Sequence, residues 1–146
     1  IVQNGGVLMS TTVDFGGKIF DELIKKSGIE EDDIRKEKFG RNFIKEPVFL
    51  EQITLLKNYI NKYYIYWLTH KETSGDSKVV LDRVLIVGEE ACMPGFLDFL
   101  SENLKIKVEA GDVWVNCFDI NDHIPNISRE DSFAYAEAIG LLIEHI

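Results

Sequence analysis

The sequence has no apolar run close to the roughly 20 residues that a helix needs to cross a bilayer. It also lacks a basic segment followed by an apolar one, the pattern of a signal peptide. Only two cysteines are present, Cys92 and Cys117, and they have no metal-ligand spacing. A free, buried pair in a reducing cytosol is favoured, with a disulfide or redox pair as the alternative. These absences predict a cytoplasmic protein without direct membrane insertion.

Basic residues are scarce: the chain has 16 Lys and Arg and 25 Asp and Glu, which gives a net charge of −9. A strongly acidic chain is repelled by phosphate backbones, so nucleic acid is not expected as a partner. The histidines His70, His123 and His145 have no ligand-like spacing, and no hydrolase, Walker or Cys–His signature occurs. No catalytic residue and no metal ligand is therefore predicted.

The chain also lacks an initial methionine. Ile1–Gln3 resembles the tail of a strand, and Asn4-Gly5-Gly6 is typical of a hairpin turn. We expect a fragment whose first strand has a partner partly upstream, with a mature N-terminus as the alternative.

Hydrophobic periodicity predicts the elements that follow the turn. The clearest is a helix over Val48–Leu68, with one apolar face formed by Phe49, Ile53, Leu56, Ile60, Tyr63, Tyr64 and Trp67. Shorter helices are predicted over Lys18–Lys26 (ended by Gly28), Glu30–Lys38, Gly95–Asn103 and from Ser128 onward. Strands are predicted over Val7–Val13, Val79–Val87, Ile106–Val108 and Val113–Val115.

Two of these elements carry further expectations. The strand Val79–Val87 is almost continuously apolar, which is typical of strands that are covered on both faces. The final helix has its apolar positions at Phe133, Ala134, Ala138, Leu141 and Leu142. Its small residues, Ala134, Ala136, Ala138 and Gly140, predict close packing against the sheet.

The order of elements predicts an α/β fold with an insertion. Residues 1–14 and 78–146 form the expected α/β subdomain, and residues 15–77 form an inserted, mainly helical subdomain.

One strand–turn–helix unit has features of a nucleotide-contact loop. The buried strand ends at Gly88, a turn follows, and Pro94-Gly95 opens the next helix. A ligand approaches a backbone closely only where side chains are absent, and helix N-termini offer N–H groups to anions. A plain β-turn-α crossover explains the same pattern.

Several motifs occur in order along nearly the whole chain. They are Phe15-Gly16-Gly17, the charged helix, the long aromatic helix, the Gly88 turn with Pro94-Gly95, and Tyr135-Ala136-Glu137-Ala138-Ile139-Gly140-Leu141. Together they resemble the second lobe of the actin-like ATPases, in the branch that holds the cell-division protein FtsA and the type IV pilus assembly protein PilM. The resemblance implies the C-terminal lobe of an actin-like (ribonuclease H-like) ATPase fold with a small helical insertion. The compact insertion and the segment KVEAGDVWVN favour the pilus branch.

The resemblance also implies which residues contact nucleotide. The matching positions are Gly16, Gly17, Asp33, Lys36, Gly88, Glu89, Pro94 and Gly95. A solvated, charged helix face is the alternative explanation for Asp33 and Lys36. Glu89 departs from the family, which has glycine there, and a carboxylate beside phosphates is repulsive.

The family implies Mg-ATP as cofactor of the intact protein, held partly by phosphate loops that this sequence does not contain. We therefore expect no cofactor and no ATP hydrolysis for these 146 residues alone, and the activity of the parent is left open. The implied partners are other pilus-assembly platform proteins, bound through the absent lobe, which place the protein beside the inner membrane.

Alternatives remain beside this interpretation. One is a nucleotide-free interaction domain on a degenerate actin-like fold, and another is an FtsA-like cell-division protein. The aromatic end of the long helix, from Tyr59 to Trp67, is explained by core packing or by a partner-binding patch. Exposure of a surface that faces the absent lobe would favour self-association.

Overall fold

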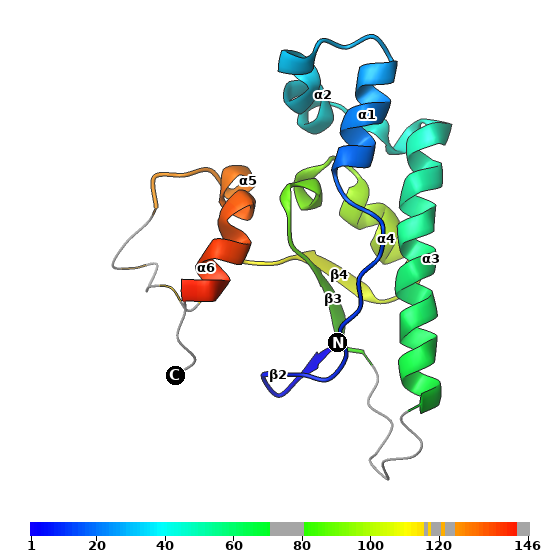
Figure 1. The fold of residues 1–146 in the computed structure, drawn as a ribbon, viewed down its shortest axis with the longest axis vertical. Helices are drawn as coiled ribbons and strands as arrows, with labels where there is room; N and C mark the ends of the chain where they lie inside the picture. Colours follow the sequence, from blue (N-terminus) through cyan, green and yellow to red (C-terminus); the bar gives the residue numbers. More distant parts are fainter. Residues whose placement is uncertain (71–80, 116, 118–120, 122–124, 143–146) are drawn as a thin grey trace.

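The computed structural model describes residues 1–70, 81–115, 117, 121 and 125–142, which form a mixed α/β chain (Figure 1). The strands are β1 (Val2–Gln3), β2 (Gly6–Val7), β3 (Arg83–Ile86) and β4 (Lys107–Ala110). The helices are α1 (Lys18–Lys26), α2 (Ile34–Gly40), α3 (Pro47–His70), α4 (Phe96–Leu104), α5 (Arg129–Ser132) and α6 (Ala136–Leu142). Short 3-10 turns are η1 (Glu31–Asp33), η2 (Phe43–Lys45), η4 (Glu89–Cys92) and η5 (Phe133–Tyr135).

The N-terminal hairpin confirms the turn predicted at Asn4-Gly5. β1 and β2 are antiparallel with Val2 opposite Val7, and the φ angles of Asn4 and Gly5 are 51° and 76°. Positive φ at both central residues is what a two-residue hairpin loop requires. The predicted strand Val7–Val13 is wrong beyond Val7. Leu8 and Met9 still bond to Ile1, but β1 is only two residues long, so the ladder does not continue past Met9 in the described residues.

Helix α3 confirms the predicted amphipathic pattern. Pro47 occupies its first position, where a missing N–H costs nothing. Phe49 and Ile53 are buried, and the rest of the predicted face is half-buried. Ile65 and Tyr66 lie on the opposite side and are 59% and 49% exposed. The helix therefore packs along one face only (Figure 1).

Strands β3 and β4 form a parallel pair joined through α4, with Val84 opposite Val108. The expectation that β3 is covered on both faces is wrong, because Leu85 and Val87 are 54% and 56% exposed. Within the described residues the sheet has two strands, and the hydrophobic core includes the half-buried Val84 and Ile86. Residues 79 and 80 of the predicted strand lie outside the described residues.

The predicted strand Val113–Val115 is instead a turn. The backbone N–H of Trp114 donates to Oδ1 of Asp112 at 3.0 Å. An aspartate that binds the backbone two residues on favours a turn over a strand, so Asp112 overrides the valines.

One hydrophobic cluster holds the molecule together. Phe20 lies at its centre, stacked on Phe49 at 6.0 Å between ring centroids and edge-on to Phe96 at 6.3 Å. The cluster comprises Phe20, Ile24, Phe43, Ile44, Phe49, Ile53, Met93, Phe96, Leu100, Leu104 and Val108. It therefore draws side chains both from residues 15–77 and from residues 78–146.

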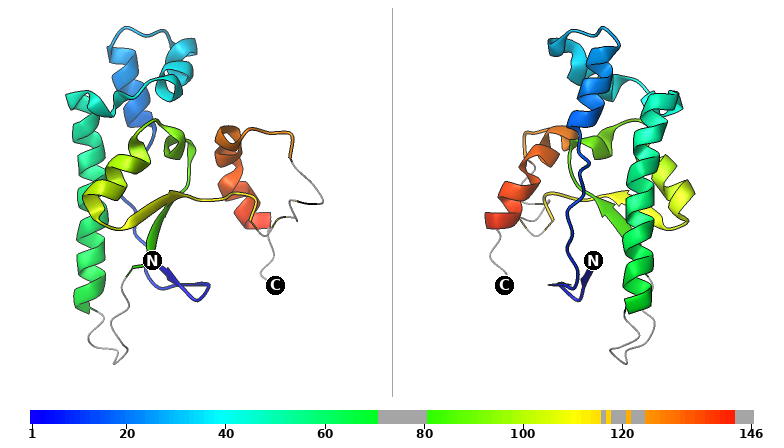
Figure 2. Two further views of the ribbon diagram at one scale, coloured as in Figure 1. Left: turned by 180° about the vertical axis from the view of Figure 1, so that it is seen from behind. Right: turned by 45° about the vertical axis from the view of Figure 1, so that its right-hand side comes forward.

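The C-terminal segment begins as predicted, because the Ser128 hydroxyl accepts from the Asp131 N–H at 3.0 Å. It then divides into α5, η5 and α6, which stand apart from α3 and α4 in both views of Figure 2. Ser132 and Phe133 are buried, but Ala134, Ala138 and Leu141 are exposed. Gly140 is exposed as well, and Ala136 is half-buried. The expected close packing of the small residues on the sheet is therefore wrong for Ala134, Ala138 and Gly140, and the side chain of Leu142 lies outside the described residues.

Candidate functional site

Several predicted site residues meet where α1, α2 and the turn η4 come together. Gly17 precedes the first residue of α1 and faces the side chain of Glu90. A Cβ atom at Gly17 would lie 1.7 Å from Oε1 of Glu90, a distance that no real Cβ contact allows. A side chain at position 17 would therefore displace the Glu90 carboxylate, which lies directly against the Gly17 backbone.

Lys38 of α2 holds that carboxylate in place. Its Nζ atom lies 2.8 Å from Oε1 of Glu90 and 2.8 Å from Oδ1 of Asp21, which belongs to α1. Lys38 is only 4% exposed. Burial alone would lower the pKa of this lysine, but the hydrogen bonds to Asp21 and Glu90 outweigh it and raise the pKa. Lys38 is therefore a charged, fully paired side chain that joins three elements.

The resemblance implied Asp33 and Lys36, rather than Lys38, as the residues of α2 and its approach that belong to the site. Both are exposed, and neither makes an ion pair or side-chain hydrogen bond within the part of the chain that the structure describes. The sequence did not identify Lys38 as a site residue, because Lys38 lies in a run of charged residues. The phase of the helix was the available signal, since Lys38 follows the half-buried Ile34 by four residues and shares its face.

Glu89 takes part in a second, more exposed group of charges. The guanidinium of Arg35 lies 3.8 Å from Oε1 of Glu89 and 2.5 Å from Oδ1 of Asp131. The pKa of Asp131 is lowered first by the Ser128 hydroxyl and then by Arg35. Arg35 therefore links α2 both to the turn and to α5. Exposed pairs of this kind contribute little to stability, because water and salt screen them.

The glycines on either side of the turn have structural roles as well. Gly88 and Gly95 adopt φ angles of 122° and 82°, which side-chain-bearing residues rarely adopt. A Cβ at Gly95 would lie 2.9 Å from the amide nitrogen of Asn42. Pro94 is half-buried between them. The protein's own side chains thus fill the space beside Gly17 and Gly95.

The charges around this junction are unfavourable for phosphate. The carboxylates of Asp21, Glu89, Glu90 and Asp131 face the cations of Arg35 and Lys38. Negative charge is therefore in excess, and both cations are already paired. A phosphate placed here would meet this excess of negative charge without a free cation among these six residues.

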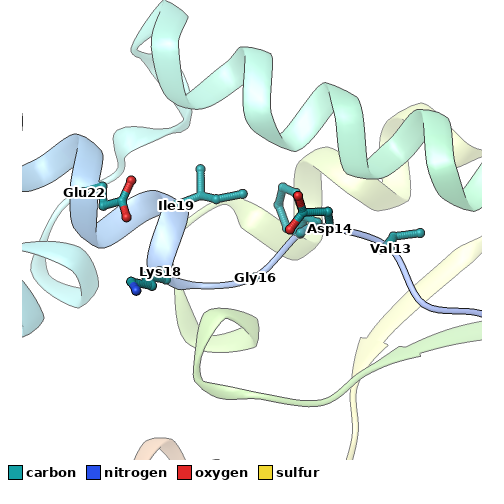
Figure 3. A pocket seen from close by; sticks show the side chains of 7 residues that line it. Val13, Asp14, Gly16, Lys18, Ile19 and Glu22 are labelled. Atoms are coloured by element: carbon teal, nitrogen blue, oxygen red, sulfur yellow. The ribbon is translucent and has the colours of Figure 1, made fainter.

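Gly16 lines an open pocket of about 400 Å³ at the start of α1 (Figure 3). Its charged side chains are those of Asp14, Lys18 and Glu22, and all three are exposed. None of the residues that line it is buried, so no polar group is held there away from water.

The remaining chemical groups offer little reactivity. Cys92 and Cys117 are both free and half-buried. Burial raises the pKa of the Cys92 thiol, which keeps it protonated and weakly nucleophilic. Among the described residues, no group of three or more His, Cys, Asp and Glu side chains is placed to hold a metal ion.

Comparisons of the chain with protein-family models, curated proteins and solved structures give no significant match. None of the helices in the described ranges combines the length and the apolar character needed to cross a membrane.

Proposed function

We propose that this chain is the second lobe of an actin-like scaffold protein for type IV pilus assembly, and that it acts through protein interactions without bound nucleotide. By the resemblance, the protein is cytoplasmic and reaches the inner membrane through a partner. The partners are the other pilus-assembly platform proteins, bound mainly through the other lobe.

The order of elements supports this assignment. Gly16 and Gly17 precede the helices α1, α2 and α3, and the parallel unit of β3, α4 and β4 follows with Gly88 at the end of its first strand. The resemblance to the actin-like second lobe implies this same order. The order of elements alone does not define a family.

The position of Glu90 carries the nucleotide-free part of the proposal. An adenosine phosphate at this junction would need the space on Gly17 that the Glu90 carboxylate fills. It would also have to separate Glu90 from Lys38, which is almost fully buried. These two contacts disfavour Mg-ATP at this junction and support the nucleotide-free proposal.

A second candidate function is a nucleotide-binding lobe. It is favoured by the approach of Gly17, which is distant in sequence, to the turn that Gly88 and Gly95 flank. In that case the Glu90 side chain would have to leave Gly17 before nucleotide enters.

Calorimetric titration of Mg-ATP into the full-length protein separates the two candidates. We expect no binding heat for the natural protein or for Glu89→Gly, because Glu90 still covers Gly17. Glu102→Gly serves as the control, since it removes an exposed carboxylate from α4. Saturable binding by the natural protein, or binding gained only in Glu89→Gly, would instead establish a nucleotide site.

The role in pilus assembly has its own test. We expect deletion of the gene in its source bacterium to abolish surface pili, counted by electron microscopy, and a plasmid copy to restore them. Normal piliation would reject this role, and filamentous, undivided cells would point to the cell-division branch.

A further inference from the structure

The first half of the turn η4 is attached to the rest of the molecule differently from Met93, the residue that directly follows the turn. Met93 is 3% exposed and belongs to the hydrophobic core. Glu90 instead reaches Lys38 and Gly17 through a carboxylate, and its side chain is 23% exposed. Gly88 begins the segment with a φ of 122°, so its backbone has the wide conformational freedom of glycine. Residues 88–90 therefore rely on polar contacts to keep their place.

Lys38 connects this half of the turn to both small helices. It belongs to α2, and its two carboxylate partners belong to α1 and to the turn. Removal of either partner leaves the buried lysine with one carboxylate. Breaking a buried pair is costly because one charge stays buried without its partner. Lys38 thus joins the three elements by ion pairs, in addition to the hydrophobic core that α1, α2 and Met93 share.

We propose that Lys38 is a latch that makes the turn at residues 88–91 and the start of α1 open and close together. When the contact between Lys38 and Glu90 breaks, the Glu90 carboxylate leaves Gly17 and both segments lose their shared support. Arg35 extends the coupling toward α5, because it contacts both Glu89 and Asp131. The latch depends only on contacts within the chain, so nucleotide binding or its absence does not decide it.

Hydrogen exchange read amide by amide tests the latch. The probes are the N–H groups of Ala91 and Met93, bonded to the carbonyls of Gly88 and Glu90, and that of Phe20, bonded to Gly17. In Lys38→Met and in Glu90→Gln we expect these amides to exchange about tenfold faster, which corresponds to about 1.4 kcal/mol. The amides of β4 should keep their protection. Glu90→Gln retains the side-chain shape and decides the test if Lys38→Met does not fold.

Lys36→Met is the matched control, because it removes the same charge from an exposed position of the same helix. It should leave all these amides unchanged. Two outcomes would overturn the latch: unchanged exchange at Ala91, Met93 and Phe20 in Glu90→Gln, or an equal acceleration that includes β4. The second outcome would mean that the ion pair adds general stability without local coupling.

Discussion

Replacement of Phe20 by alanine is expected to lower the free energy of unfolding by about 3–5 kcal/mol. Phe20 is fully buried, and its ring contacts Phe15, Phe49 and Phe96 with centroid distances of 5.8, 6.0 and 6.3 Å. Alanine would leave a cavity between α1, α3 and α4, because rings held by three separate elements cannot collapse into it. Urea unfolding followed by circular dichroism gives the measurement.

Leu141→Ala provides the control for this change. Leu141 is 88% exposed, so its truncation should alter the stability by no more than about 0.5 kcal/mol. A loss below about 1 kcal/mol in Phe20→Ala would contradict the structure, since it would mean that α1 does not pack on α3 and α4 as described.

The second large effect is expected for Gly17→Ala, with a loss of about 1–2 kcal/mol. The new Cβ would lie 1.7 Å from Oε1 of Glu90, so the carboxylate must move away from Lys38. Because the side chain of Glu90 is flexible, the main cost is the broken ion pair rather than a clash with the backbone. Thermal and urea unfolding of the variant measure this loss.

Two further variants show whether Glu90 causes that loss. Gly16→Ala is the matched control, because a Cβ at Gly16 would meet no atom within 4 Å. In a Glu90→Ala background, Gly17→Ala should cost only a few tenths of a kcal/mol, which is the small N-terminal preference of glycine over alanine. Equal losses for Gly16→Ala and Gly17→Ala, or additive losses for Gly17 and Glu90, would refute the close contact.

The sequence predicted those features that depend on neighbouring residues. The turn at Asn4-Gly5, the helix end at Gly28 and the cap at Ser128 are set by local backbone and side-chain chemistry. The buried face of α3 follows from its 3.6-residue period. The structure confirms all four.

The features that escaped prediction depend on tertiary contacts. Lys38 lies in a charged run that is typical of a solvated helix, and its partner Glu90 is 52 residues away along the chain. Whether Leu85 and Val87 are covered depends on which elements lie across β3, and the apolar run of the strand carries no such information. The exposed positions of Ala134 and Ala138 likewise follow from the break between α5 and α6.

The uncovered face of β3 bears on how this protein behaves at high concentration. Leu85 and Val87 are more than half exposed on one side of a short sheet, where copies can adhere to one another. The net charge of −9 opposes that contact by mutual repulsion. The range of the repulsion falls to about 8 Å at physiological salt and about 3 Å in molar salt. Colloidal stability of this chain therefore depends on ionic strength, and dilute buffer is the condition that preserves monodispersity.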